Sequence, residues 1–154
     1  MLFLQNGETF ATGVMEYEYH PINPGGINQR IILRITVDDI PALAVLDTGG
    51  PYLIVAPAVA DRLGFAPNSS LERTDITIRG DKYYGNLHRV DVKLTAKDGA
   101  SITFQSTAFV PDASQEEKWG KLPTFLGIEN CLDRIRFALD PDPDEPKFYF
   151  GALP

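Results

Sequence analysis

The feature that most constrains this sequence is an apolar run that leads straight into an acidic residue and two glycines. Ala44-Val45-Leu46 is followed at once by Asp47-Thr48-Gly49-Gly50. A carboxylate at the end of a buried strand must be hydrogen-bonded, shared or functional, because an unpaired buried charge is costly. The two glycines have no Cβ, so their backbone can approach a neighbour closely. The pattern therefore predicts a strand that ends in a tight acidic loop.

The rest of the chain is rich in β-branched residues and in alternating apolar and polar residues, which favour strands. The predicted strands are residues 16–20, 30–37, 40–46, 52–55, 75–79, 87–96, 100–105, 107–110, 123–127, 135–139 and 147–150. Residues 57–63 and 128–134 are predicted as short helices. The sequence therefore predicts a mostly β fold with one or two short helices. We expect one domain over residues 27–154, preceded by an N-terminal extension over residues 1–26 that is partly strand-like.

Composition excludes several functions. The formal net charge is −7 and no run of Lys or Arg occurs, so we expect no nucleic-acid partner. No apolar stretch has the length of a membrane span, and residues 1–4 are too short for the apolar core of a signal peptide. We therefore expect a cytoplasmic protein without a membrane partner. His20, His88 and the single Cys131 have no ligand spacing, so we expect no metal and no cofactor.

The acidic motif occurs once. Two carboxylates that share a proton can supply both the base and the acid that hydrolysis by water requires. The chain has no second Asp-Thr-Gly or Asp-Ser-Gly, although Thr124-Phe125-Leu126-Gly127 faintly resembles the segment that ends in Asp47. A two-fold dimer would bring Asp47 and its symmetry mate together. The chemistry therefore predicts a site shared by two copies of the chain.

The segment from Ala44 to Gly50 resembles the active-site signature of the retropepsin-like aspartic proteases. Further landmarks follow in the family's order over roughly residues 27–153. A hairpin centred on residues 80–85 resembles the flap, and Phe125-Leu126-Gly127 resembles the loop that packs over the catalytic loop. The resemblance implies a closed acid-protease β-barrel with a flap hairpin. It also implies a homodimeric endopeptidase that acts on peptides or unfolded proteins, with residues 147–153 as an interface strand.

The resemblance also assigns residues. Asp47, Thr48 and Gly49 would be catalytic. The residues that would bind substrate are Gly50, Gly80, Tyr83, Tyr84, Phe125, Leu126 and Gly127. The chain departs from the family's pattern at Gly50, where Ala, Ser or Thr is usual, and at Lys82, Tyr83 and Tyr84, where the flap is usually glycine-rich.

Alternatives remain open from the sequence. Asp47-Thr48-Gly49 could be an ordinary turn, since Asp and Gly both favour turns. Tyr83 and Tyr84 could contact substrate or pack across strands. Instead of a protease, the chain could be a non-proteolytic dimerisation or peptide-binding module of the same fold, or a monomeric structural β protein.

Overall fold

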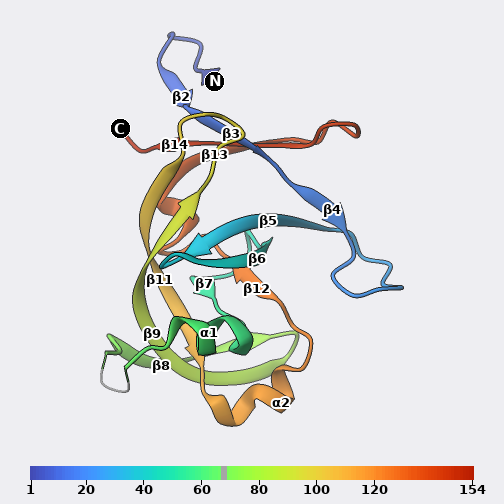
Figure 1. Ribbon diagram of the computed structural model, residues 1–154, viewed down its shortest axis with the longest axis vertical. Helices are drawn as coiled ribbons and strands as arrows, with labels where there is room; N and C mark the ends of the chain where they lie inside the picture. Colours follow the sequence, from blue (N-terminus) through green and yellow to red (C-terminus); the bar gives the residue numbers. More distant parts are fainter. Residues whose placement is uncertain (67–68) are drawn as a thin grey trace.

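The structure, a computed structural model, describes residues 1–66 and 69–154, and most of them lie in strands (Figure 1). The strands are β1 (Leu2–Phe3), β2 (Thr9–Ala11), β3 (Gly13–Glu16), β4 (Glu18–His20), β5 (Arg30–Val37), β6 (Ile40–Leu46), β7 (Leu53–Ile54), β8 (Glu72–Ile78), β9 (Asp81–Leu94), β10 (Asp98–Gly99), β11 (Ile102–Pro111), β12 (Thr124–Leu126), β13 (Ile135–Asp140) and β14 (Lys147–Ala152). The helices are α1 (Pro57–Leu63), α2 (Glu116–Trp119) and the 3₁₀ turns η1 (Ala113–Gln115) and η2 (Leu132–Arg134). The prediction of a mostly β fold with one or two short helices is confirmed, and α1 lies where a helix was predicted, whereas α2 was not predicted.

Two large sheets organise the described chain, besides the two-stranded pair of β1 and β2. The larger one has the strand order β4-β5-β6-β12-β7-β11-β9-β8, and β5 also pairs with β9. These pairings therefore lead from β5 through β6, β12, β7, β11 and β9 back to β5, although only Thr36 and Val37 join β5 to β9. The closed barrel of the retropepsin type remains a prediction.

The second sheet, called the terminal sheet below, has the order β10-β3-β14-β13. It lies at the end of the molecule opposite α1 and α2 (Figure 1). The N-terminal residues take part in it, because β3 pairs with both β10 and β14. Met15 and Tyr17 are buried in the main core together with Phe148 and Phe150.

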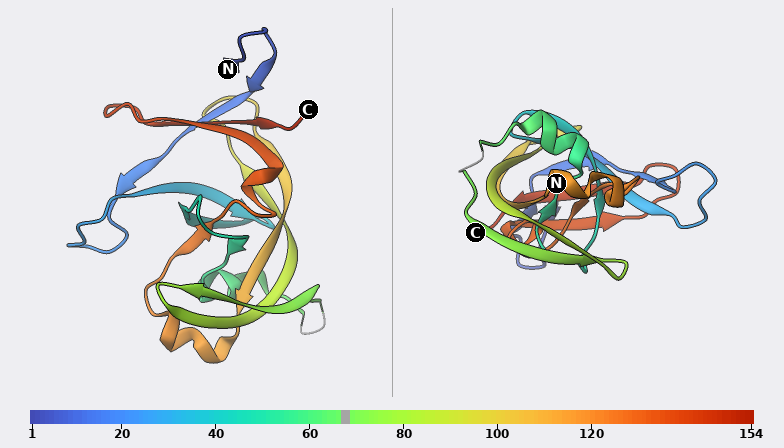
Figure 2. Two further views of the ribbon diagram at one scale, coloured as in Figure 1. Left: turned by 180° about the vertical axis from the view of Figure 1, so that it is seen from behind. Right: turned by 90° about the horizontal axis from the view of Figure 1, so that it is seen from below.

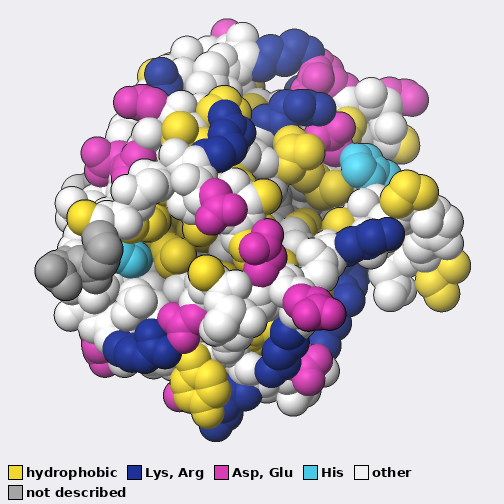
Figure 3. Space-filling view, turned by 60° about the horizontal axis from the view of Figure 1, so that its bottom comes forward, with side chains coloured by type: hydrophobic (Ala, Val, Ile, Leu, Met, Phe, Trp, Pro, Cys, Tyr) yellow, Lys and Arg dark blue, Asp and Glu magenta, His cyan; other side chains and the backbone are white. Residues whose placement is uncertain are grey.

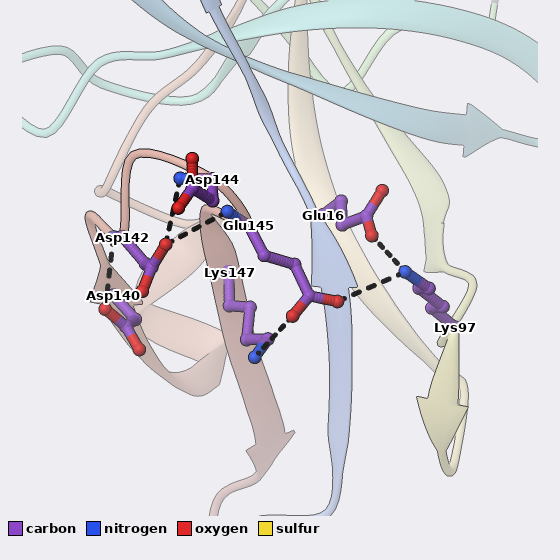
Figure 4. A network of polar contacts seen from close by, with 7 residues as sticks. All are labelled: Glu16, Lys97, Asp140, Asp142, Asp144, Glu145 and Lys147. Atoms are coloured by element: carbon purple, nitrogen blue, oxygen red, sulfur yellow. Dashed lines mark hydrogen bonds and ion pairs between the residues drawn. The ribbon is translucent and has the colours of Figure 1, made fainter.

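A polar network ties the edge of the terminal sheet to the turn between β13 and β14 (Figure 4). Lys97 forms ion pairs with Glu16 of β3 and with Glu145, which also pairs with Lys147 at 3.1 Å. The Asp142 carboxylate accepts the backbone N–H groups of residues 144 and 145 at 2.9 and 3.1 Å. The carboxylate of Asp142 thus stabilises the turn, and that of Glu145 is engaged in ion pairs.

Three expected elements differ from the structure. The flap hairpin turns at Arg79 and Gly80, which have φ values of 51° and 85°, and residues 82–85 belong to β9 instead of to the turn. Residues 128–134 do not form the expected helix, because Asn130 has a φ of 54° and only η2 is helical. The expected dimer strand, β14, is already paired on both sides, with β3 and β13.

Neither α-helix meets the length and apolarity of a membrane-crossing helix, and no other helix in the described part of the chain does so.

Candidate active site

Asp47 stands at the end of β6 on a loop that leaves its carboxylate accessible. The Asp47 side chain is only partly buried, and Thr48 and Gly49 are exposed. The backbone N–H of Gly49 donates to Asp47 Oδ1 at 3.2 Å, and the N–H of Gly50 donates to the Asp47 carbonyl at 3.2 Å. The first bond directs a backbone N–H dipole at the carboxylate, and the second closes the loop as a turn.

The loop at Gly127 holds the Asp47 loop in place. Strand β12 runs parallel to β6 in register, with Phe125 opposite Val45 and Leu126 opposite Leu46. The Asp47 N–H donates to the Leu126 carbonyl at 3.0 Å. Asp47, which follows β6, and Gly127, which follows β12, therefore lie next to each other at the ends of two paired strands. The faint similarity between the two segments in the sequence thus corresponds to two adjacent parallel strands.

Gly127 is in close contact with the acidic loop. Its N–H donates to the Tyr52 carbonyl at 2.9 Å, and the next N–H, that of Ile128, donates to the Gly50 carbonyl at 2.8 Å. A Cβ on Gly127 would lie 2.5 to 2.7 Å from the carbonyl oxygens of Tyr52, Gly50 and Pro51. Only glycine allows this approach without a shift of the backbone.

A cleft of about 700 Å³ opens above Asp47. Its floor is the loop from Leu46 to Tyr52, its apolar wall includes Ile54 and Phe125, and its roof is formed by Asp75 to Ile78 of β8 and by Arg79 of the turn that follows. Figure 2, left, shows the light-green hairpin of β8 and β9 crossing the molecule below the end of β6. The acid therefore lies at the bottom of a groove that a β-hairpin covers.

Comparison with solved structures decides the architecture. A retropepsin-like aspartic protease from Rickettsia conorii superposes with a TM-score of 0.56 at 19% identity, covering 94% of this chain and 98% of that one. The fold is retropepsin-like. EIAV protease (in complex with the inhibitor HBY-793) gives a TM-score of 0.43 at 21% identity over 68% of this chain and 88% of that one. The retroviral protease-like domain of Ddi1 from Leishmania major gives 0.46 at 15% identity, with 81% and 94% covered.

Comparisons of the sequence alone do not reveal this similarity. No protein-family model matches the chain, and no curated protein matches it.

Within the retropepsin-like fold, the predicted site residues of the acidic loop and of the Phe125–Gly127 segment lie in or behind the cleft. Asp47, Thr48, Gly49, Gly50 and Phe125 line the cleft. Leu126 is fully buried behind it, and Gly127 packs against the back of the acidic loop.

The residues predicted in the flap lie elsewhere. Gly80, Tyr83 and Tyr84 are outside the lining of the cleft. Tyr83 is 2% exposed and packs edge-to-face on Trp119, with ring centroids 5.1 Å apart. The backbone N–H of Tyr84 donates to the Gln115 side-chain amide oxygen at 2.9 Å. The Tyr83 ring thus packs against α2, outside the cleft.

Several cleft residues were not predicted from the sequence. Ile76 and Ile78 come from β8, whose alternating pattern was recognised as a strand without indicating which face would meet the acid. Arg30, Arg79 and Glu129 lie around the groove, and no local pattern in the sequence connects them to Asp47.

Other reactive side chains are not arranged as a site. No group of three or more His, Cys, Asp or Glu residues in the described chain is placed to hold a metal ion. Burial raises the pKa of Cys131 to about 11, so its thiol stays protonated and unreactive at neutral pH. The carboxylates that line the cleft are those of Asp47, Asp75 and Glu129.

Proposed function

We propose that this protein is a homodimeric aspartic endopeptidase in which Asp47 of each copy supplies one carboxylate. The observation that supports the proposal best is the position of Asp47, accessible in a cleft of about 700 Å³ on a loop against which Gly127 packs so closely that no Cβ would fit there. Thr48 and Gly49 are exposed beside it in the single chain, where a second copy could pack.

In the proposed dimer, one Asp47 carboxylate carries a proton and its mate is ionised, because two negative charges in contact repel strongly. The ionised group removes a proton from a water molecule as its oxygen attacks the peptide carbonyl carbon. The protonated group donates its proton to the carbonyl oxygen, which gives a neutral tetrahedral intermediate. Transfer of a proton to the nitrogen then breaks the C–N bond and releases an amine and an acid.

The roof of the cleft suits an extended peptide. Strand β8 is the last strand of the larger sheet, so one of its edges has no partner strand in the described chain. An extended peptide can add to such an edge through main-chain hydrogen bonds. The side chains of Ile76, Ile78 and Phe125 would then contact apolar residues of the peptide near the bond that is cut.

Replacing one oxygen of the acid tests the proposal. Asp47→Asn should reduce the cleavage of a denatured-protein mixture by at least about 10³-fold, because neither copy can then act as the base. The readout is peptide release followed by mass spectrometry between about pH 3 and 8. Asp61→Asn removes a carboxylate from α1, outside the cleft, and should leave the rate unchanged. A dimeric wild-type protein that cuts nothing over this range would refute the enzymatic function.

One observation favours a second candidate, a non-proteolytic module that binds peptides or partners. The strand expected to join two copies, β14, is already paired on both sides, so this route to a dimer is closed. A binding module would retain its peptide affinity in Asp47→Asn and show no cleavage in the wild type. Sedimentation at micromolar concentration and the separation of the two Asp47 carboxylates in a dimer distinguish the candidates.

A further inference from the structure

Two arginines lie together at one end of the cleft. Arg30 begins β5 and Arg79 is in the turn of the flap hairpin, and both line the main cleft. Both also line a neighbouring hollow of about 150 Å³ whose other wall is the loop at residues 21–28. Figure 2 shows this loop and the turn of the hairpin projecting on the same side of the molecule in both views. Arg30 and Arg79 are called the arginine corner below.

The arginine corner has no counter-charge of its own. Within residues 1–66 and 69–154, neither Arg30 nor Arg79 has a carboxylate within 4.0 Å, and Arg30 donates only to the backbone carbonyl of residue 29, at 3.2 Å. The residues that line the hollow include no Asp or Glu. By contrast, Arg73 and Arg136 each donate to a carboxylate, at 2.9 Å or less.

This local excess of positive charge runs against the rest of the molecule, whose formal net charge is −7. Figure 3 shows basic side chains next to the projecting loop on the right of the view, close to its exposed hydrophobic side chains. Two cations that face one small hollow repel each other, and an anion placed between them relieves that repulsion. A guanidinium binds a carboxylate with two parallel hydrogen bonds, which makes arginine well suited to this anion.

We propose that the arginine corner binds a carboxylate of the peptide, beyond the apolar residues that contact Ile76, Ile78 and Phe125. This inference rests on the proposed function for the cleft, and it names the substrate class as apolar peptides flanked by acidic residues. Because the proposed dimer is two-fold symmetric, each end of the joint cleft carries one arginine corner. The flap contributes Arg79, so the peptide carboxylate would also hold the hairpin over the cleft.

Binding to a protein that cannot cut tests the inference separately from catalysis. Fluorescent peptides with a central apolar segment would be titrated against Asp47→Asn and followed by anisotropy. One peptide carries Glu on its flanks, one Gln and one Lys, and each is made with a free and an amidated C-terminus. The Glu peptide should bind about three- to tenfold tighter than the Gln peptide at low salt, and the difference should shrink as salt is added. The two C-terminal forms show whether a side chain or the chain end supplies the carboxylate.

Removal of the arginines should abolish the preference. Arg79→Gln and Arg30→Gln, each combined with Asp47→Asn, should reduce the Glu-to-Gln difference to less than about twofold. Arg62→Gln, which removes a charge from α1 outside the cleft, should keep the full difference. Equal binding of the three peptides would refute the inference, as would a preference that survives both arginine substitutions.

Two further outcomes separate this inference from its alternatives. If Arg30→Gln weakens the dimer in sedimentation and leaves the peptide preference intact, Arg30 faces the second copy and the inference is wrong. If the wild type cleaves peptides without a preference for acidic flanks, the proposed function is supported, and the inference that the arginine corner binds a peptide carboxylate is wrong. If the preference is present and no cleavage occurs, the corner stands and the protease proposal fails.

Discussion

Gly127 shows how a single residue can fix the position of the acid. Its lack of a Cβ lets the chain after β12 touch three carbonyl oxygens of the Asp47 loop at once. The resemblance of Phe125-Leu126-Gly127 to the retropepsin loop that packs over the catalytic loop implied this contact. It did not predict the detail that the two parallel strands are in register, since that depends on a pairing across 80 residues of chain.

Gly127→Ala should therefore destabilise the protein by about 2 kcal/mol or more, because the new methyl group overlaps backbone oxygens that cannot move separately. Chemical denaturation measures the free energy of unfolding, and peptide cleavage should fall with it. Gly49→Ala is the matched control for stability, since its Cβ would meet only the Asp47 carboxylate, at 3.6 Å. Equal stability of the two variants would show that the loop at Gly127 is not a fixed support.

Among the elements, the flap hairpin is braced from outside by the segment of η1 and α2. The side-chain amide of Gln115 bonds both the N–H and the carbonyl of Tyr84, at 2.9 and 2.5 Å. Arg73 of β8 donates two hydrogen bonds to Asp112, at 2.9 and 2.5 Å, and Lys118 donates to the Lys82 carbonyl at 2.5 Å. The hairpin and this segment are thus expected to move as one body.

The sequence placed the turn of this hairpin too late, and Gly85 explains the error. Gly80 and Gly85 bracket polar residues, a pattern that suggests a turn between them. In the structure Gly85 lies inside β9, where a Cβ would come within 2.2 Å of the Val110 carbonyl oxygen. That glycine serves close packing between strands, and a local pattern cannot distinguish this use from a turn.

Asp112→Asn should loosen the hairpin. The variant loses the ion pair with Arg73, which is partly exposed, so we expect a cost of about 0.5 to 1 kcal/mol and faster hydrogen exchange of the β8 and β9 amides. Asp75→Asn is the matched control, because Asp75 pairs only loosely with Lys82, at 3.9 Å. Unchanged exchange in Asp112→Asn would show that the brace does not restrain the hairpin.

The same contact should depend on pH. The hydrogen bonds from Arg73 hold the pKa of Asp112 below its ordinary value. The contact therefore has its full strength above the pKa of an unfolded aspartate, and it is lost as the pH falls through the lower folded pKa. Trp119, the single tryptophan of the chain, packs on Tyr83 of the hairpin and reports the change by its fluorescence.

For the whole molecule, the strand pattern was enough to predict a mostly β fold, whereas the retropepsin-like architecture was predicted from the resemblance of the segments around Asp47 and Gly127 to that family. The partners of the last strand were not predictable, because β14 could pair with another copy or with its own β3 and β13, and the sequence suits both. Pairing within the chain leaves β13 as one of the two outer strands of the terminal sheet, with the two-residue β10 at the other edge. A second copy that extends this sheet at β13 would have to meet Leu139, which is 39% exposed.

Leu139→Lys should weaken the proposed dimer, because it places a charge on an apolar contact at the edge of β13. Analytical ultracentrifugation over a concentration series should show a dimer dissociation constant about tenfold or more above that of the wild type. Leu43→Lys changes another exposed leucine, on β6, and should leave the assembly unchanged. Identical behaviour of both variants would place the dimer contact away from β13.

The pairing of β3 with β14 also has a consequence for how the chain reaches its native state. These two strands come from opposite ends of the sequence, and both contribute to the buried core through Met15 and Phe148. Contacts between such distant residues slow folding, because the entropy of closing the long intervening loop is lost before the contact forms. During synthesis, β3 must therefore wait until β14 has emerged before the two strands can pair, and the terminal sheet should become resistant to proteolysis later than the larger sheet.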